Sequence, residues 1–276
     1  TLLPICVVVC AVLAALAPRN QLNESPELFF KPRTAEKQAI DLVNQHMAGT
    51  STIEFAIYTN AEGAVASPEF LATIEAFSEW IKTQYGVGYV QTVGDTFKRL
   101  NQNMHGDDPQ WYRQPQDREL ASQYLLLYEM SLPYGLDLSN QINLDKSGVR
   151  INVTTKYLHA ANKIALKKKA VAWFAEQAPS YRVVPTGHAT IMEQMVIEHL
   201  MPDMLRGGII AIGMVSLVLF VVLRNWKLGL MGMLANLLPV MMGYGVWSQV
   251  NGLANIAVMS VAGICLGVVV DFAVHF

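Results

Sequence analysis

Asp271 and His275 are the two residues of the sequence whose types and spacing best suit proton chemistry. Asp271 is the only Asp, Glu, Lys or Arg in the apolar stretch 253–276, which is long enough to cross a bilayer, since about 20 helical residues suffice. A carboxylate at that depth costs roughly 2.5–3.5 kcal/mol on insertion scales, so membrane acids usually handle an ion, a proton or a buried partner. His275 follows one helical turn later. The alternatives are a structural polar group for Asp271 and an interfacial side chain for His275.

The elements that must position this pair are apolar segments of membrane-spanning length. The sequence is 52% apolar and 15% charged, which is too hydrophobic for an ordinary soluble domain. Besides 253–276, residues 206–223 and 228–247 are predicted to span a membrane, and 1–17 is a shorter apolar segment. Two interpretations of 1–17 stay open: a truncated transmembrane helix, which is favoured because further spans follow, or a signal peptide.

The short loop between the second and third segments predicts the orientation of the chain. It contains Arg224 and Lys227, and basic loops tend to face the cytoplasm. Residues 18–205 are then expected to be periplasmic or extracellular, on the outer side of the inner (plasma) membrane. We also expect the chain to be the first part of a longer protein, because four helices with one acid would make an unusual transport path.

Two β-α-β patterns are predicted within 18–205. In the first, residues 53–57 alternate like a half-buried strand, a helix begins at Pro68, and 88–93 is a short strand. In the second, 151–157 alternates, 160–177 is helical and 181–184 is the closing strand. The predicted fold class is a polytopic α-helical membrane protein with a large α+β exoplasmic domain made of two β-α-β subdomains.

Several short motifs, in this order, resemble the resistance–nodulation–division (RND) superfamily, in particular its predicted hydrophobe and lipid exporters related to the mycobacterial membrane-protein-large (MMPL) group. They are Tyr89-Val-Gln-Thr-Val-Gly-Asp95, PQDRELASQYLLLY from Pro115 to Tyr128, Pro185-Thr186-Gly187, Leu234-Ala-Asn-Leu-Leu-Pro239 and residues 267–276. The resemblance covers nearly the whole chain.

The resemblance implies a proton-driven inner-membrane exporter with two similar halves, of which this chain would be the first half through its fourth helix. The implied partners are a lipid or other hydrophobic cargo, the membrane and the remaining half of the same polypeptide. A homo-oligomer and periplasmic partner proteins stay open as further partners. Many relatives carry two adjacent acids in the fourth helix, whereas Phe272 follows Asp271 here. Other relatives have an aromatic residue at that place.

Two further groups of residues are candidates for roles in the membrane. The first group is expected to let helices pack closely or bend, and it consists of Gly263, Gly267, Asn236 and Pro239. The second is a weak candidate for an adaptable surface that binds apolar cargo, and it consists of Met192, Met195 and Met201. Core packing is the favoured alternative for these methionines.

The sequence contains no motif of a hydrolase, a phosphate-binding loop or a zinc protease. We therefore predict no enzyme activity, no cofactor and no metal site, and the net charge of −2 gives no indication of nucleic acid. The predicted function is export or outward transfer of a hydrophobic or amphiphilic molecule, driven by the proton-motive force. The alternatives are a sterol-sensing-type lipid sensor or scaffold without pumping, and a SecDF-like aid to protein export.

Overall fold

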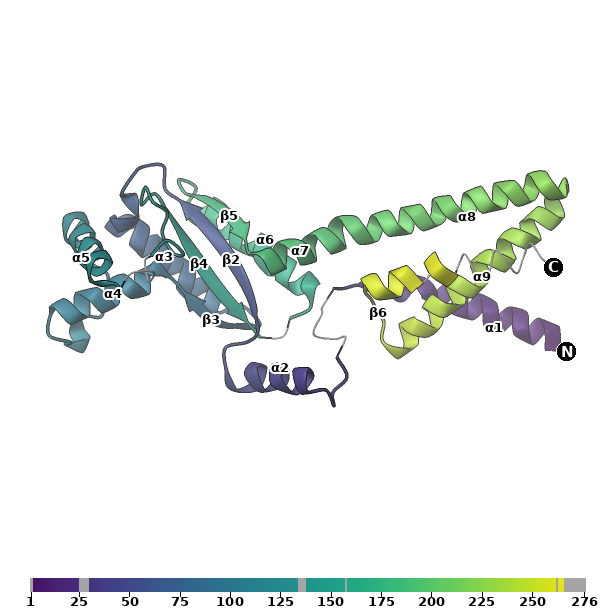
Figure 1. Ribbon diagram of the computed structural model, residues 1–276, viewed down its shortest axis with the longest axis horizontal. Helices are drawn as coiled ribbons and strands as arrows, with labels where there is room; N and C mark the ends of the chain where they lie inside the picture. The colour runs from purple at the N-terminus through teal and green to yellow at the C-terminus, as the bar shows by residue number, and fades with distance from the viewer. Residues whose placement is uncertain (1, 25–29, 134–137, 157, 262, 266–276) are drawn as a thin grey trace. The chain divides into compact units, whose positions relative to one another are not determined.

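The structure is a computed structural model, and it describes residues 2–24, 30–133, 138–156, 158–261 and 263–265 (Figure 1). The chain divides into two compact units. One is an α/β unit, Glu27–Met192, and the other is a helical unit that combines Thr1–Pro26 with Glu193–Phe276.

The α/β unit is built on one four-stranded sheet. Its strands are β2 (Ser51–Tyr58), β3 (Val87–Gln91), β4 (Gly148–Thr155) and β5 (Arg182–Thr186). They lie in the order β3-β4-β2-β5, and every neighbouring pair is antiparallel. The strand β4 therefore separates β2 from β3, and β2 separates β4 from β5. This is the split β-α-β, or ferredoxin-like, arrangement, in which two β-α-β segments interleave in a single sheet.

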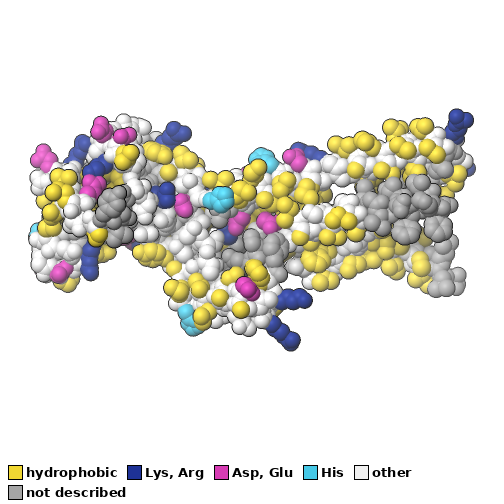
Figure 2. Space-filling model, in the orientation of Figure 1, with side chains coloured by type: hydrophobic (Ala, Val, Ile, Leu, Met, Phe, Trp, Pro, Cys, Tyr) yellow, Lys and Arg dark blue, Asp and Glu magenta, His cyan; other side chains and the backbone are white. Residues whose placement is uncertain are grey.

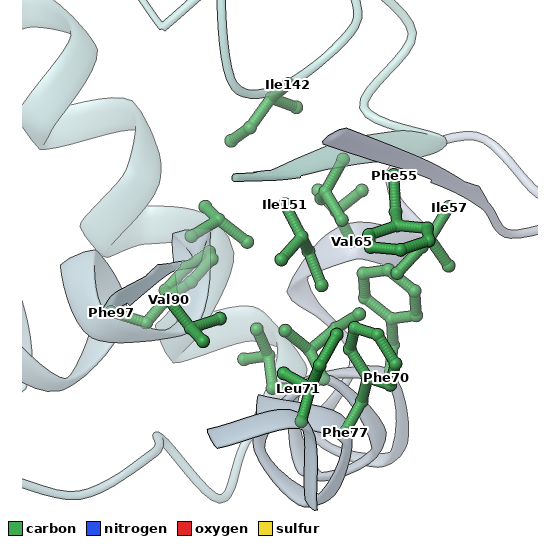
Figure 3. Packing of buried hydrophobic residues seen from close by; sticks show 14 of the residues in the cluster. Phe55, Ile57, Val65, Phe70, Leu71, Phe77, Val90, Phe97, Ile142 and Ile151 are labelled. Carbon is green, nitrogen blue, oxygen red and sulfur yellow. The ribbon is translucent and has the colours of Figure 1, made fainter. Parts of the chain in front are cut away.

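Two helices bury the apolar side of this sheet. They are α3 (Pro68–Lys82) and α6 (Ala160–Gln177), which lie behind the strands in Figure 1. The alternation of β2 places Ile53, Phe55 and Ile57 on the buried side, and all three are fully buried. Figure 3 shows Phe55 and Ile57 beside the aromatic rings of Phe70 and Phe77 from α3.

Three more helices belong to the α/β unit. They are α2 (Ala35–His46), α4 (Val93–Met104) and α5 (Arg118–Ser131). Helix α4 begins in a capping box, in which Thr92 and Asp95 satisfy each other's backbone N–H groups. Helix α5 contacts α4, and a 3₁₀ turn at Pro109–Trp111 lies between them in sequence.

The helical unit is organised around α9 (Trp226–Val250), which contacts both α1 (Leu2–Leu16) and α8 (Met201–Leu223). Arg224 ends α8 in the left-handed conformation, and Asn225 caps α9 through the Lys227 N–H. The boundary between the units falls after Met192, within α7 (His188–Met195), and a π-helical turn at Val196–Leu200 precedes α8. Two short strands, β1 (Gln21–Leu22) and β6 (Leu253–Ala254), pair in parallel. Apolar side chains dominate the visible face of α8 in Figure 2.

The predicted fold class is wrong. Within the described residues only two helices are long and apolar enough to cross a membrane, Thr190–Val222 and Trp226–Val250, rather than the four that a polytopic protein of the expected kind requires. The apolar helices Pro4–Arg19 and Ile256–Cys265 are shorter within the described residues. The two expected subdomains are also absent from the described part, because their strands share one sheet. The described part of the chain is mostly helical, with nine α-helices.

Candidate functional site

The predicted proton pair, Asp271 and His275, lies outside the described residues, and so does Gly267. Gly263 is described, and a Cβ built on it would have no heavy atom within 4 Å. The proposed roles of all four residues stay predictions. The described residues form one candidate site, which lies between α9 and the helical segment Ile256–Cys265 that follows it.

An apolar pocket of about 420 Å³ opens between α9 and this segment. Its volume is within the range of about 300–1,000 Å³ that is typical of small-molecule sites. A Cβ built on Gly243 would meet no heavy atom within 4 Å, so the glycine leaves the pocket open at that turn. The lining residues are Pro239, Val240, Gly243, Tyr244, Trp247, Ala257, Val258, Val261 and Cys265. The lining is hydrocarbon and aromatic, which suits an apolar ligand.

Asn236 adds a polar group to the same side of α9. Residues at spacings of three, four and seven share one helix face, so Asn236 lies on the face that carries Pro239, Val240 and Gly243. Asn236 is only 1% exposed. Neither its amide nitrogen nor its amide oxygen has a hydrogen-bond partner among the described residues. A buried amide without partners costs about 1–3 kcal/mol, but Asn236 does not line the pocket, so a molecule bound there does not reach this amide.

Hydrogen bonds fix the two walls of the pocket. The Trp247 indole N–H donates to the Leu253 carbonyl oxygen at 2.8 Å, and the Tyr244 hydroxyl donates to Met259 Sδ at 3.4 Å. These contacts join α9 to the chain that follows it. The aromatic rings of the lining therefore have defined positions.

The start of the second wall is capped by two acceptors. The buried Glu24 accepts from the Ile256 N–H at 3.1 Å, and Asn255 Oδ1 accepts from the Val258 N–H at 2.9 Å. Both bonds satisfy N–H groups that a helix start leaves without partners, and a carboxylate there also suits the helix dipole. The segment 20–24 thus ties the N-terminal part of the chain to this wall.

Close packing of α1 against α9 depends on Gly245. A Cβ on Gly245 would overlap the carbonyl oxygen of Leu13, and the Asn20 side-chain amide donates to the Tyr244 carbonyl oxygen at 2.8 Å beside this contact. Gly229 of α9 is a second glycine at such a contact, because a Cβ there would overlap the Phe220 ring of α8. No small-xxx-small pattern indicates Gly245, since the residues four positions away are Met241 and Gln249.

Gly245→Ala is expected to destabilise the α1–α9 packing by about 1–3 kcal/mol, because the added methyl group overpacks a backbone contact. Gly213→Ala on α8 is the matched control, since a Cβ there meets nothing within 4 Å. Both changes improve helix propensity by a similar amount, so that contribution cancels. Thermal unfolding of the two variants in lipid nanodiscs compares them, and equal midpoints would contradict the close approach.

The candidate methionines do not share one environment. Met192 and Met195 on α7 are exposed, whereas Met201 at the start of α8 is buried. Pro239 lies inside α9 and lines the pocket. Sequence reasoning missed Tyr244 and Trp247 as pocket residues, although both lie on the face of α9 marked by Asn236 and Val240.

Comparison with known proteins gives no match for this chain among protein-family models or curated proteins.

Proposed function

We propose that the protein is membrane-bound and handles a hydrophobic or amphiphilic, lipid-like molecule, which it binds in the apolar pocket on α9. The observation that carries this proposal is the pocket itself, with an apolar lining and a volume of about 420 Å³. An apolar body fits the pocket, whose lining is hydrocarbon and aromatic. The part of the molecule that enters the pocket is therefore expected to be apolar.

Two long apolar helices support the location in a membrane, since Thr190–Val222 has 33 residues and Trp226–Val250 has 25. Arg224 and Lys227 lie at the turn between α8 and α9, and the tendency of basic turns to face the cytoplasm favours the inner membrane with residues 18–205 on the outer side. With residues 18–205 on the outer side, the bound molecule would move from the inner membrane outward. The RND resemblance supports transport of this molecule rather than its storage.

The proposed energy source is the proton gradient. The sequence has no phosphate-binding loop, whereas Asp271 is an acid in an otherwise uncharged apolar stretch. Asp271 would take up and release the proton, with His275 as its neighbour one turn away. A second candidate function is lipid sensing without pumping, which the same pocket would also serve.

Gly243→Leu is expected to reduce binding at the pocket at least about fivefold, because the new side chain fills the space that the glycine leaves open. Gly213→Leu on α8 is the control, since the same change there also meets open space but does not line the pocket. The measurement is cross-linking of a photoactivatable fatty acid to the protein in nanodiscs, with the labelled peptides identified by mass spectrometry.

Labelling should concentrate on peptides that cover residues 239–261 and should decrease only in the Gly243 variant. Equal labelling of both variants, or labelling confined to other peptides, would reject the pocket as the binding site. If the protein binds the fatty acid but does not transport it, the result would favour the second candidate function, lipid sensing.

A further inference from the structure

We propose that the α/β unit carries a second site, for a neutral hydroxyl-rich ligand of the saccharide class. The site is a cleft of about 490 Å³ between β3, α4, α5 and the turn that follows α4. We call it the tyrosine cleft. Its lining residues are Tyr89, Gln91, Thr92, Asp95, Thr96, Arg99, Leu100, Asn103, Tyr112 and Tyr128. The site differs from the α9 pocket in its unit and in its polar lining, so the inference does not rest on the proposed function.

One side of the tyrosine cleft is a polar stripe along α4. Asp95, Arg99 and Asn103 follow one another at intervals of four residues and therefore lie on one face of the helix. Asp95 Oδ2 accepts from Thr92 at 3.2–3.3 Å, and Arg99 Nη1 donates to Gln102 at 3.1 Å. A carboxylate offers about four acceptor positions and a guanidinium five donors, so both groups keep capacity for a ligand.

Tyrosine rings make up the other side of the cleft. Tyr89 on β3 is 52% exposed and Tyr112 in the turn after α4 is 47% exposed, while Tyr128 on α5 is half-buried. The face of an aromatic ring carries negative charge density, and the C–H bonds on one side of a sugar ring are slightly positive. A sugar can therefore stack on a tyrosine ring while its hydroxyl groups donate to Asp95 and accept from Arg99.

The turn that carries Tyr112 is held in place before any ligand binds. The Asn101 side-chain amide donates to the carbonyl oxygens of Trp111 and Arg113, at 3.1 and 3.0 Å. The rings of His105 and Trp111 stack with their centroids 3.6 Å apart. These contacts hold Trp111 and Arg113, the two neighbours of Tyr112, so binding of a ligand does not have to order the turn. A preformed site of this kind loses less entropy on binding.

The charges around the cleft select against a cationic ligand. Lys98 Nζ lies 5.8 Å from the centre of the Tyr112 ring and 2.6 Å from Glu75. Burial acts to lower the pKa of Lys98, but the hydrogen bond and negative charge of Glu75 outweigh it and the pKa is raised. Lys98 therefore stays positive, and its ammonium group already lies over the Tyr112 ring where a cationic ligand would otherwise bind.

An anionic ligand would gain from Arg99 but would face the carboxylate of Asp95, which lines the same stripe. The opposite charges of these two residues instead fit hydroxyl groups, which donate to one and accept from the other. A free saccharide and the sugar headgroup of a glycolipid share this chemistry.

The test is a glycan array of hexoses, amino sugars and disaccharides, probed with the full chain in phosphatidylcholine nanodiscs, followed by calorimetric titration of the best binder. We expect saturable binding that Tyr112→Ala and Arg99→Ala each weaken at least about tenfold. Tyr85→Ala is the control, because Tyr85 is 84% exposed and does not line the cleft. Phosphocholine and inorganic phosphate serve as the competing probes.

Two sources of the sugar are distinguished by adding digalactosyldiacylglycerol to the nanodiscs. A weaker apparent affinity for the free sugar then identifies a glycolipid headgroup, and an unchanged affinity identifies a free saccharide. The inference is overturned if no sugar binds saturably, if binding is the same in the Tyr112 and Tyr85 variants, or if phosphocholine or phosphate binds in place of the sugars. None of these outcomes depends on fatty-acid labelling of the α9 pocket.

Discussion

Phe77→Ala is expected to lower the free energy of unfolding of the α/β unit by about 3–5 kcal/mol, the usual cost of emptying a buried aromatic site. Phe77 is 0% exposed. Its ring centroid lies 4.7 Å from that of Phe174 on α6 and 5.8 Å from that of Phe55 on β2. The side chain thus joins both helices to the sheet. Loss of the ring removes these contacts and leaves a cavity that the surrounding side chains refill only in part.

Urea unfolding of the full chain in nanodiscs measures this effect, because the fluorescence of Trp80 and Trp173 reports on the same cluster. Tyr85→Ala removes an aromatic ring of similar size from an exposed position and should change the stability by less than about 0.5 kcal/mol. Phe77→Leu should fall between the two variants. If the Phe77 and Tyr85 variants unfold at the same urea concentration, the cluster does not hold the unit together.

The four strands of the α/β unit and the two helices that cover its sheet could be predicted from local pattern, whereas helix α2 and the pairing of the strands were not predicted. The predicted helix at 160–177 is confirmed as Ala160–Gln177, and the alternating residues 53–57 lie within Ser51–Tyr58. Alternation identifies which side chains of a strand are buried but carries no information about its neighbour. The partner of Phe55 in β4 is Ile151, almost a hundred residues later. Two local β-α-β patterns were therefore interpreted as two subdomains instead of one interleaved sheet.

The candidate sites also could not be predicted in full, because local pattern does not show which segments of the chain come together. The face of α9 with Asn236 and Val240 follows from helical spacing, but the pocket also needs Val258 and Val261 from the next segment. In the tyrosine cleft, Tyr89 and Tyr112 come from a strand and a turn that local pattern does not bring together. Among the described residues, fewer helices reach membrane-spanning length than hydropathy alone predicted, and residues 266–276 of the fourth predicted span lie outside them.

Asp271→Asn is expected to abolish gradient-driven transport while leaving membrane insertion and fatty-acid binding intact. Asn keeps the size and the hydrogen-bonding capacity of Asp but cannot gain or lose a proton. A two-state pump requires a group whose charge differs between its states, since only a differential interaction can shift their balance. An ionised carboxylate is disfavoured in hydrocarbon and favoured in water, so a change in water access at Asp271 would supply that difference.

The size of the effect follows from the membrane potential. One proton charge that crosses 100 mV supplies about 2.3 kcal/mol, which corresponds to roughly a 50-fold ratio of cargo concentrations. Loss of this coupling should therefore reduce the attainable ratio of cargo concentrations across the membrane roughly 50-fold for each proton carried. Proteoliposomes with an imposed proton gradient and a labelled fatty acid provide the measurement.

Two controls separate coupling from folding in this experiment. Asp203→Asn removes a carboxylate from the first turn of α8, where it pairs with Arg206 at an exposed position, and should leave transport unchanged. Dissipating the gradient with an ionophore should bring the unaltered protein down to the level of the Asp271 variant. Full gradient-dependent transport by Asp271→Asn would exclude a proton role for this residue. If the unaltered protein binds the fatty acid but shows no gradient-dependent transport, the pocket instead serves a sensor or scaffold, because binding then occurs without any work being drawn from the gradient.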